Sequence, residues 1–376
     1  MKAPRIPSRV SSIRKLATQA STQLDSDLRI PGRGRKLAMF ATQFTTLLQS
    51  GVPLVQTLEA LRDQSEDPVF ALVLESVVTR VSGGARLSQA LGLFRGVFPP
   101  VFTGMVAVGE NTGGLVQATD RLGAMLQKEE RLNQRVRGAL SYPIFVVVLT
   151  GALTIIMFRF VLPTFVDFFA SSGQELPLVT RLVLALTQWS GTVWFWTLCA
   201  TVALAAWRLG QGLWAHPLNR LRIYRLMLRL PLLGEILQMA TLARFCWVMQ
   251  LCLATGLELV RSLQLAADAS HSPVLQFETG GLQSSVREGG NLSAAMARSP
   301  AVFPGILRQL VLLGEEATGM SDCFGYAAGW FEEELDSRIE VFKSALEPLL
   351  MTGIGLMVGC ILLSVFLPLY GLLDKL

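Results

Sequence analysis

The chain has 376 residues, of which 51% are hydrophobic and 16% are charged. This composition is apolar-rich for a soluble protein and is typical of a chain that lies partly in lipid. The formal net charge of +5 is modest, and the two histidines and five cysteines show no paired spacing. A disulfide framework and a metal site are therefore not expected, and no cofactor is predicted.

Residues 1–36 form a basic segment that we expect to be disordered. Before Phe40 the acids are Asp25 and Asp27, and the bases are Lys2, Arg5, Arg9, Arg14, Lys15, Arg29, Arg33, Arg35 and Lys36. These bases are not followed by an apolar stretch, so the segment is not a secretory signal, and the N-terminus is expected in the cytoplasm. Such a segment can contact anionic lipid, nucleic acid or an acidic partner; of these, nucleic acid is not among the predicted partners.

The chain contains an internal sequence repeat in which equivalent residues, such as Gly51 and Gly256, lie 205 positions apart. The same offset joins Phe40 to Phe245, Leu58 to Leu263, Ser88 to Ser293, Phe98 to Phe303, Pro99 to Pro304, Gly109 to Gly314, Glu110 to Glu315, Gly114 to Gly319 and Pro143 to Pro348. A register kept over this length predicts two copies of one domain.

Each copy has helical spacing, since Phe40, Phe44 and Leu47 fall on one stripe of a helix. Gly51 breaks this helix, and Pro53 suits the first turn of the next. The third helix is expected to begin at a polar cap followed by proline, which is Asp67 before Pro68 in copy one and Ser272 before Pro273 in copy two. Further helices are expected after Pro99 and over 115–140, so each copy is a helical bundle.

Three stretches are apolar enough to span a bilayer, at 142–166, 189–208 and 348–372. The first carries one charge, Arg159, near its far end, and four tryptophans flank or lie in the second. A rival apolar window, 232–260, is interrupted by Glu235, Arg244 and Glu258 and is expected to be bundle core. Basic residues flank the bundles, which places both bundles in the cytoplasm and the loop near Ser171 in the periplasm.

The predicted fold is therefore all-α, an integral membrane protein with two homologous cytoplasmic helical bundles and three transmembrane helices. The expected order is a basic segment at 1–36, a first bundle at 37–140, a transmembrane helix at 142–166, a periplasmic loop at 167–188, a transmembrane helix at 189–208, a second bundle at 209–345, a transmembrane helix at 348–372 and a periplasmic tail at 373–376.

Reactive constellations are missing from the sequence. It contains no Gly-Lys-Ser/Thr of a P-loop, no His-Glu-x-x-His and no Gly-x-Ser-x-Gly. His216 and His271 are expected to be surface residues, and the spans carry no chain of acids or histidines for ions. No catalytic, cofactor-binding or metal-binding residue is predicted, and the protein is not expected to be an enzyme.

Several motifs stand in one order along the chain and are partly repeated in its second half. They are Phe40-Ala-Thr-Gln-Phe-Thr-Thr-Leu-Leu-Gln-Ser-Gly-Val-Pro-Leu-Val-Gln-Thr-Leu58, Phe98-Pro99, Gly109-Glu110-Asn-Thr-Gly113-Gly114-Leu115 and Ser141-Tyr142-Pro143. Together they resemble the F-domain family of type II secretion and type IV pilus proteins, GspF and PilC, from about Phe40 to the C-terminus. The second copy departs slightly, with Glu347 in place of the tyrosine before its proline.

The resemblance implies an inner-membrane platform that couples a cytoplasmic hexameric ATPase to the assembly of pilins or pseudopilins. The implied partners are that ATPase, pilins or pseudopilins and other inner-membrane components of the machine, in addition to the lipid bilayer. Which of these machines it serves, including a competence system, stays open. A small-solute transporter with two regulatory bundles is the alternative.

Candidate site residues follow from the repeated motifs. The candidate partner interface is Gly109, Glu110, Gly114, Gly314, Glu315 and Gly319, for which a helix end is the structural alternative. The motif residues expected to be structural are Gly51, Pro53, Phe98, Pro99, Pro143, Gly256, Phe303, Pro304 and Pro348. Gly355 and Gly359 form a small-xxx-small pair that predicts a membrane helix contact, from which a homo-oligomer would follow.

Overall fold

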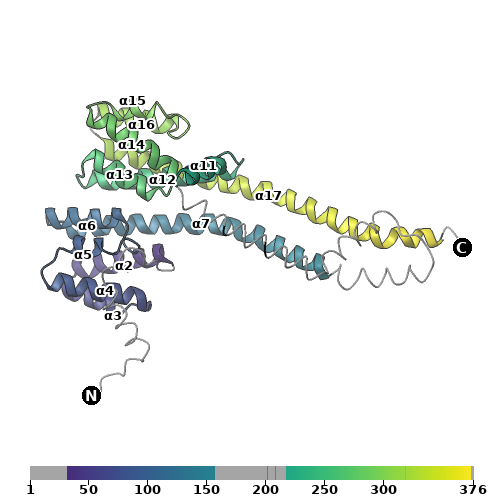
Figure 1. Ribbon diagram of the computed structural model, residues 1–376, viewed down its shortest axis with the longest axis horizontal. Helices are drawn as coiled ribbons and strands as arrows, with labels where there is room; N and C mark the ends of the chain where they lie inside the picture. The colour runs from purple at the N-terminus through teal and green to yellow at the C-terminus, as the bar shows by residue number, and fades with distance from the viewer. Residues whose placement is uncertain (1–31, 157–200, 202–207, 209–216, 318, 374–376) are drawn as a thin grey trace, which may run out of the picture. The chain divides into compact units, whose positions relative to one another are not determined.

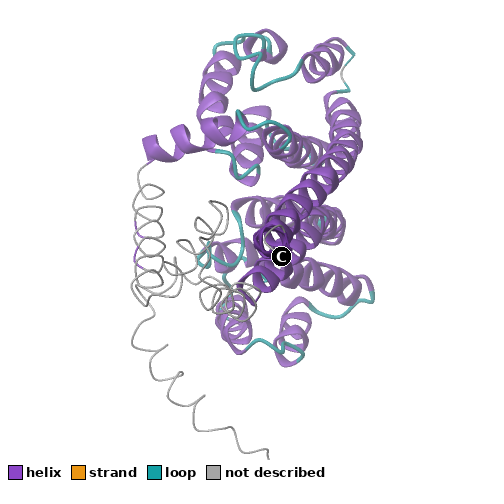
Figure 2. Ribbon diagram, turned by 90° about the vertical axis from the view of Figure 1, so that its right-hand side faces the viewer, coloured by secondary structure: helices purple, strands orange, loops and turns teal. Residues whose placement is uncertain are grey.

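The computed structural model describes residues 32–156, 201, 208, 217–317 and 319–373. These residues form helices, turns and loops, and no strand occurs among them (Figure 2). This confirms the all-α prediction. The predicted loop at 167–188, almost all of the basic segment and of the span at 189–208, the end of the first span and most of the C-terminal tail lie outside the described residues.

The first repeat contains six helices among the described residues. They are α2 (Arg33–Gln49), α3 (Leu54–Asp63), α4 (Pro68–Ser82), α5 (Leu87–Gly92), α6 (Pro100–Thr112) and α7 (Leu115–Ile156) (Figure 1). The second repeat follows α11 (Pro217–Leu228), and its helices are α12 (Leu233–Ala254), α13 (Leu259–Ala269), α14 (Pro273–Arg287), α15 (Leu292–Met296), α16 (Gly305–Glu316) and α17 (Met320–Leu373).

The helix order confirms the sequence repeat, and the turns match in conformation as well as in position. Gly51 has φ 80° and its counterpart Gly256 has φ 78°, while Gly84 and Gly289 have φ 92° and 82°. These are left-handed values that side chains with a Cβ rarely adopt, so glycine is required at both copies of each turn.

Aromatic side chains fill the core of each bundle. Phe40 contacts Phe98 with ring centroids 5.7 Å apart, and the equivalent pair Phe245 and Phe303 lies at 6.3 Å. Phe98, Phe245 and Phe303 are fully buried. Burying an aromatic or aliphatic side chain of this size contributes about 1.5–3 kcal/mol, so these phenylalanines stabilise the core of each bundle.

Both predicted caps are present at the start of the third helix. The Asp67 carboxylate accepts hydrogen bonds from the backbone N–H of Val69 at 2.8 Å and of Phe70 at 3.3 Å, and it also pairs with Lys36. The Ser272 hydroxyl accepts one from the N–H of Leu275 at 3.3 Å. Different residues therefore satisfy the same unpaired donors in the two repeats.

Helices α7 and α17 are longer than the sequence boundaries suggested. The prediction of a polar helix ending near Leu140, followed by a separate span, is wrong at this junction, because α7 continues without interruption to Ile156 and contains Pro143 (Figure 1). Likewise α17 runs through Pro348 to Leu373. Proline lacks an N–H but bends a helix without ending it when the flanking turns hold.

The two repeats belong to one compact unit, which comprises residues up to Asn133 together with Leu237–Glu334. A second unit comprises Gln134–Ile236 and Leu335–Leu376. Helix α12 passes a length and hydropathy test for a membrane span, yet 67% of its apolar window is buried. The interpretation of this stretch as bundle core is thus confirmed.

Candidate functional site

Glu110, a predicted interface residue, caps a neighbouring helix. Its carboxylate accepts hydrogen bonds from the backbone N–H of Leu87 at 2.6 Å and of Ser88 at 3.2 Å, and from the Ser88 hydroxyl. These donors form the start of α5, where the first N–H groups of a helix have no partner within it. A carboxylate there is also favoured by the positive end of the helix dipole.

Glu315 does the same in the second repeat. It accepts hydrogen bonds from the N–H of Leu292, from the N–H of Ser293 at 3.4 Å and from the Ser293 hydroxyl, all at the start of α15. Both glutamates are half-buried. Each carboxylate is held by its tertiary contact with the short helix of the same repeat, so both glutamates act as helix caps. Partner binding by these residues stays a prediction.

The glycine before each glutamate allows a close helix contact. A Cβ on Gly109 would lie 2.8 Å from the Cα of Leu115 and 3.0 Å from the Cβ of Ala118. On Gly314 it would lie 3.0 Å from the Cα of Met320. Leu115 and Met320 are equivalent in the sequence repeat. In both motifs, therefore, the first residue of the long helix packs against the helix that precedes it.

Of the adjacent glycines, sequence reasoning selected Gly114 and Gly319 but missed Gly113. Gly113 ends α6 with φ 71°, a left-handed C-cap, whereas neither Gly114 nor Gly319 has a positive φ. The run Gly113-Gly114 was the available signal, since a helix C-cap takes the first glycine after the last helical residue.

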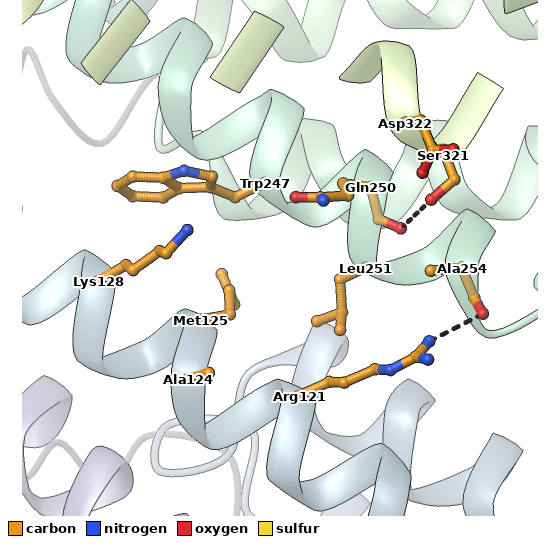
Figure 3. A pocket seen from close by; sticks show the side chains of 10 residues that line it. All are labelled: Arg121, Ala124, Met125, Lys128, Trp247, Gln250, Leu251, Ala254, Ser321 and Asp322. Carbon is orange, nitrogen blue, oxygen red and sulfur yellow. Dashed lines mark hydrogen bonds between the residues drawn. The ribbon is translucent and has the colours of Figure 1, made fainter. Parts of the chain in front are cut away.

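The first repeat contacts the second through one face of α7. The guanidinium of Arg121 donates to the carbonyl oxygen of Ala254 at 2.9 Å, and that of Arg244 donates to the side-chain oxygen of Asn133 at 2.8 Å. Figure 3 shows Arg121, Met125 and Lys128 facing α12. A cavity of about 340 Å³ lies beside this contact, and sequence reasoning did not identify it.

A second pair of helices completes the contact between the repeats. Leu265 of α13 lies against Gly104 of α6, where an added Cβ would be 3.3 Å from its Cδ1. The hydroxyl of Thr255 lies 3.7 Å from the sulfur of Met105, which is fully buried. Separation of the two repeats would expose Met105 and Leu265, which are both buried here.

The later parts of the two long helices expose large apolar side chains. On α7 the exposed residues include Tyr142, Ile144, Phe145, Val147, Val148, Leu149, Leu153 and Ile156. None of the apolar window of α7 is buried. On α17 they include Leu349, Met351, Leu356 and Val358. Continuous apolar surface on a lone helix is unfavourable in water and favourable in lipid, so these parts form a membrane-embedded surface.

Gly355 and Gly359 lie on this part of α17. A Cβ on either would meet no other atom within 4 Å among the residues that the structure describes. This open space leaves room for a second helix at both positions, and the membrane helix contact stays a prediction.

Among the described residues, no group of three His, Cys, Asp or Glu side chains lies close enough to hold a metal ion. Burial raises the pKa of the Cys246 thiol, and it raises that of Cys252 to about 12 against a hydrogen bond with Ser262. His271 lies at the surface, as predicted, and His216 is outside the described residues.

Two segments of the chain, residues 40–163 and 245–368, match the family model described as type II secretion system (T2SS), protein F. The segments begin 245 minus 40, or 205, residues apart, which is the repeat offset. The chain belongs to the type II secretion system protein F family. Each matched segment thus comprises one helical bundle and the apolar helix that follows it, all of α7 in the first segment and α17 as far as residue 368 in the second.

Named relatives of this family member assemble pili or serve secretion. The chain is 32% identical to the type IV pilus assembly protein PilC of Thermus thermophilus, over 94% of this chain and 87% of the relative. It is 30% identical to the type IV pilus assembly protein TapC of Aeromonas hydrophila, over 90% and 81%. It is 28% identical to the type II secretion system protein F of Pseudomonas aeruginosa, over 90% and 83%. These relatives give no support to the transporter alternative.

Proposed function

We propose that this protein is the inner-membrane platform of a type IV pilus or type II secretion machine. In this role it couples a cytoplasmic assembly ATPase to the addition of pilin or pseudopilin subunits to a filament. It acts by binding and by transmitting movement, and it carries out no chemical reaction of its own.

The observation that carries the proposal is the family match to both bundles, since each domain continues into an exposed apolar helix. A protein built in this way has cytoplasmic surface for a motor and membrane-embedded surface for subunits that wait in the bilayer. The names of the relatives, which include both pilus assembly proteins and secretion proteins, support the same two machines.

The proposed partners are a hexameric ATPase, pilins or pseudopilins, other inner-membrane components and a second copy of the chain. The half-buried motifs around Glu110 and Glu315 would present the short helices α5 and α15 to such a partner rather than bind it through their carboxylates. The caps hold these helices in place, and the exposed residues of the same helices would make the contact.

Deletion of the gene in its host tests the function. Loss of surface pili or of exoprotein export, restored by the gene in trans, is the expected result. Normal pili and export together with altered uptake of a small solute would contradict the proposal. Measuring both outputs in one strain also distinguishes the pilus from the secretion version.

The proposed orientation has both bundles in the cytoplasm. A reporter enzyme that works only in the cytoplasm is expected to be active when it is fused at Gly84 or at Gly290. A reporter enzyme that works only in the periplasm is expected to be active when it is fused at Ser171. A periplasmic reporter at Gly290 would contradict the predicted second span, which lies mostly outside the described residues.

A further inference from the structure

A cavity of about 570 Å³ lies between the two repeats, within the compact unit that they form together. Its walls come from the start of α2, the start of α6 and the segment before it, one face of α7, α12 and the turn after α13. Pockets that bind small molecules have volumes of roughly 300–1,000 Å³. The cavity is therefore large enough for a small organic ligand.

Three arginines and two carboxylates line this cavity. The first repeat contributes Arg33, Arg95 and Glu129, and the second contributes Arg244 and Asp268. A guanidinium has five N–H donors in a planar fork that fits phosphate oxygens, so it can bind a protein group and a ligand at once. Carboxylates next to such bases accept hydrogen bonds from hydroxyl groups.

His271, which also lines the cavity, shows that these charges converge on one place. Partial burial lowers the pKa of His271, the Glu129 carboxylate raises it, and the guanidiniums of Arg244 and Arg33 lower it. Charges from α2, α7 and α12 thus act on one imidazole. His271 also has φ 58°, a left-handed value that is uncommon for a residue with a Cβ, and such conformations cluster at ligand sites.

The sequence repeat provides an internal comparison for the lining residues. Both acids recur, since Glu129 corresponds to Glu334 and Asp268 to Asp63. The bases do not recur. Their counterparts are Gln238 for Arg33, Pro300 for Arg95, Met39 for Arg244 and Glu66 for His271. A charge that the fold of each bundle needs would occur in both copies, so these bases serve the cavity, which both repeats build together.

We propose that this cavity binds a small phosphate ester that also carries hydroxyl groups. The three guanidiniums bind the phosphate, and Glu129 and Asp268 accept hydrogen bonds from the hydroxyls. The ligand contacts both repeats, as the bond of 2.8 Å from Arg244 to Asn133 already does. Binding therefore stabilises the contact between the repeats. The inference does not depend on the platform function.

Two sources have this chemistry, a soluble sugar phosphate and the headgroup of phosphatidylglycerol. Titration of the purified full chain in lipid nanodiscs tests for both. Ribose 5-phosphate is the soluble probe, and ribose at the same ionic strength is its control, because it lacks the phosphate. In nanodiscs of phosphatidylcholine, ribose 5-phosphate at about one hundred times Kd is expected to raise Tm by about 5–10 °C, and ribose is expected to leave Tm unchanged.

Arg95→Gln is the main variant, because Arg95 is exposed and its loss should not disturb folding. Calorimetric titration is expected to show binding weakened by about tenfold or more. The matched control is Arg80→Gln, which removes another exposed arginine of the first repeat that does not line the cavity. Arg244→Gln tests the second repeat in the same way, and its Tm without ligand measures the effect of losing the bond to Asn133.

A second set of nanodiscs contains phosphatidylglycerol. If the lipid supplies the phosphate, the apparent affinity for ribose 5-phosphate falls there, and Arg95→Gln removes this competition. Equal affinity in both lipids assigns the site to a soluble ester. Three results would overturn the proposal. They are equal binding of ribose and ribose 5-phosphate; equal weakening by Arg95→Gln and Arg80→Gln; and no phosphate-dependent binding of either the soluble probe or the lipid.

Discussion

Replacing Glu110 by alanine removes a carboxylate that accepts three hydrogen bonds at the start of α5. Loss of a helix cap costs about 1 kcal/mol, and a hydrogen bond to a charged group contributes about 1.5–3 kcal/mol. Water can reach part of this half-buried site and replace some of the loss. We therefore expect the free energy of unfolding to fall by about 2–3 kcal/mol.

Thermal unfolding of the full chain in detergent measures this effect. For 150–250 folded residues, each kcal/mol lowers Tm by about 2–4 °C, so Glu110→Ala is expected to lower it by about 5–10 °C. Glu110→Gln keeps an acceptor oxygen and is expected to cost about 1 kcal/mol. Glu316→Ala is the control, because Glu316 is an exposed neighbour of the equivalent glutamate Glu315.

Equal Tm values for Glu110→Ala and Glu316→Ala would refute the capping argument. Reversal of the same residue to lysine tests the cap further. Glu110→Lys places an ammonium against N–H donors, so reduced accumulation in the membrane is expected. Normal accumulation with failed filament assembly would instead support direct partner binding by this carboxylate.

Three further predictions concern a cap, a glycine and two thiols. Burial alone would raise the pKa of Asp67, but hydrogen bonds from Lys36 and two backbone N–H groups hold this pKa below the ordinary 3.8. The ionised Asp67 therefore stabilises the fold above pH 3.8, and this stabilisation is lost as the pH falls through the lowered pKa. The variant Asp67→Asn should flatten the acid limb of a curve of Tm against pH. Gly109→Ala should cost about 1–3 kcal/mol of stability by overpacking, whereas Gly138→Ala, whose Cβ meets nothing within 4 Å, should be neutral or stabilising in the same Tm assay. A maleimide at pH 8 should label the half-buried Cys323 much faster than Cys252, and equal rates would contradict the burial of Cys252.

Local sequence signals predicted most of the fold. The offset of 205 residues located both bundles, and glycines at turns and polar residues before prolines located helix ends. These features depend on a few neighbouring residues, so a single sequence contains them. The helix boundary predicted near Leu140 was misplaced. The change from polar to apolar residues there marks where the helix enters lipid, whereas the backbone hydrogen bonds of α7 continue to Ile156.

The candidate site was harder to predict because its contacts join distant residues. Glu110 bonds to residues more than 20 positions earlier, which no local pattern reveals. A signal was nevertheless present, since Ser88 and Glu110 recur together as Ser293 and Glu315. The role of Arg121 had no such signal, because its counterpart is a tyrosine and the two repeats use that position differently.

Pro143 and Pro348 occupy equivalent places in the two longest described helices, close to where exposed apolar side chains begin. Each removes one backbone hydrogen bond, so bending stiffness is lowest at that turn. Helix α7 has 42 residues, or about 63 Å at 1.5 Å per residue. Pro143 lies 13 residues before the end of α7 at Ile156. A change of about 10° at Pro143 would move that end by roughly 3 Å, about the width of a small side chain. Small rotations of a bundle can thus become displacements that a neighbouring helix in the bilayer would feel.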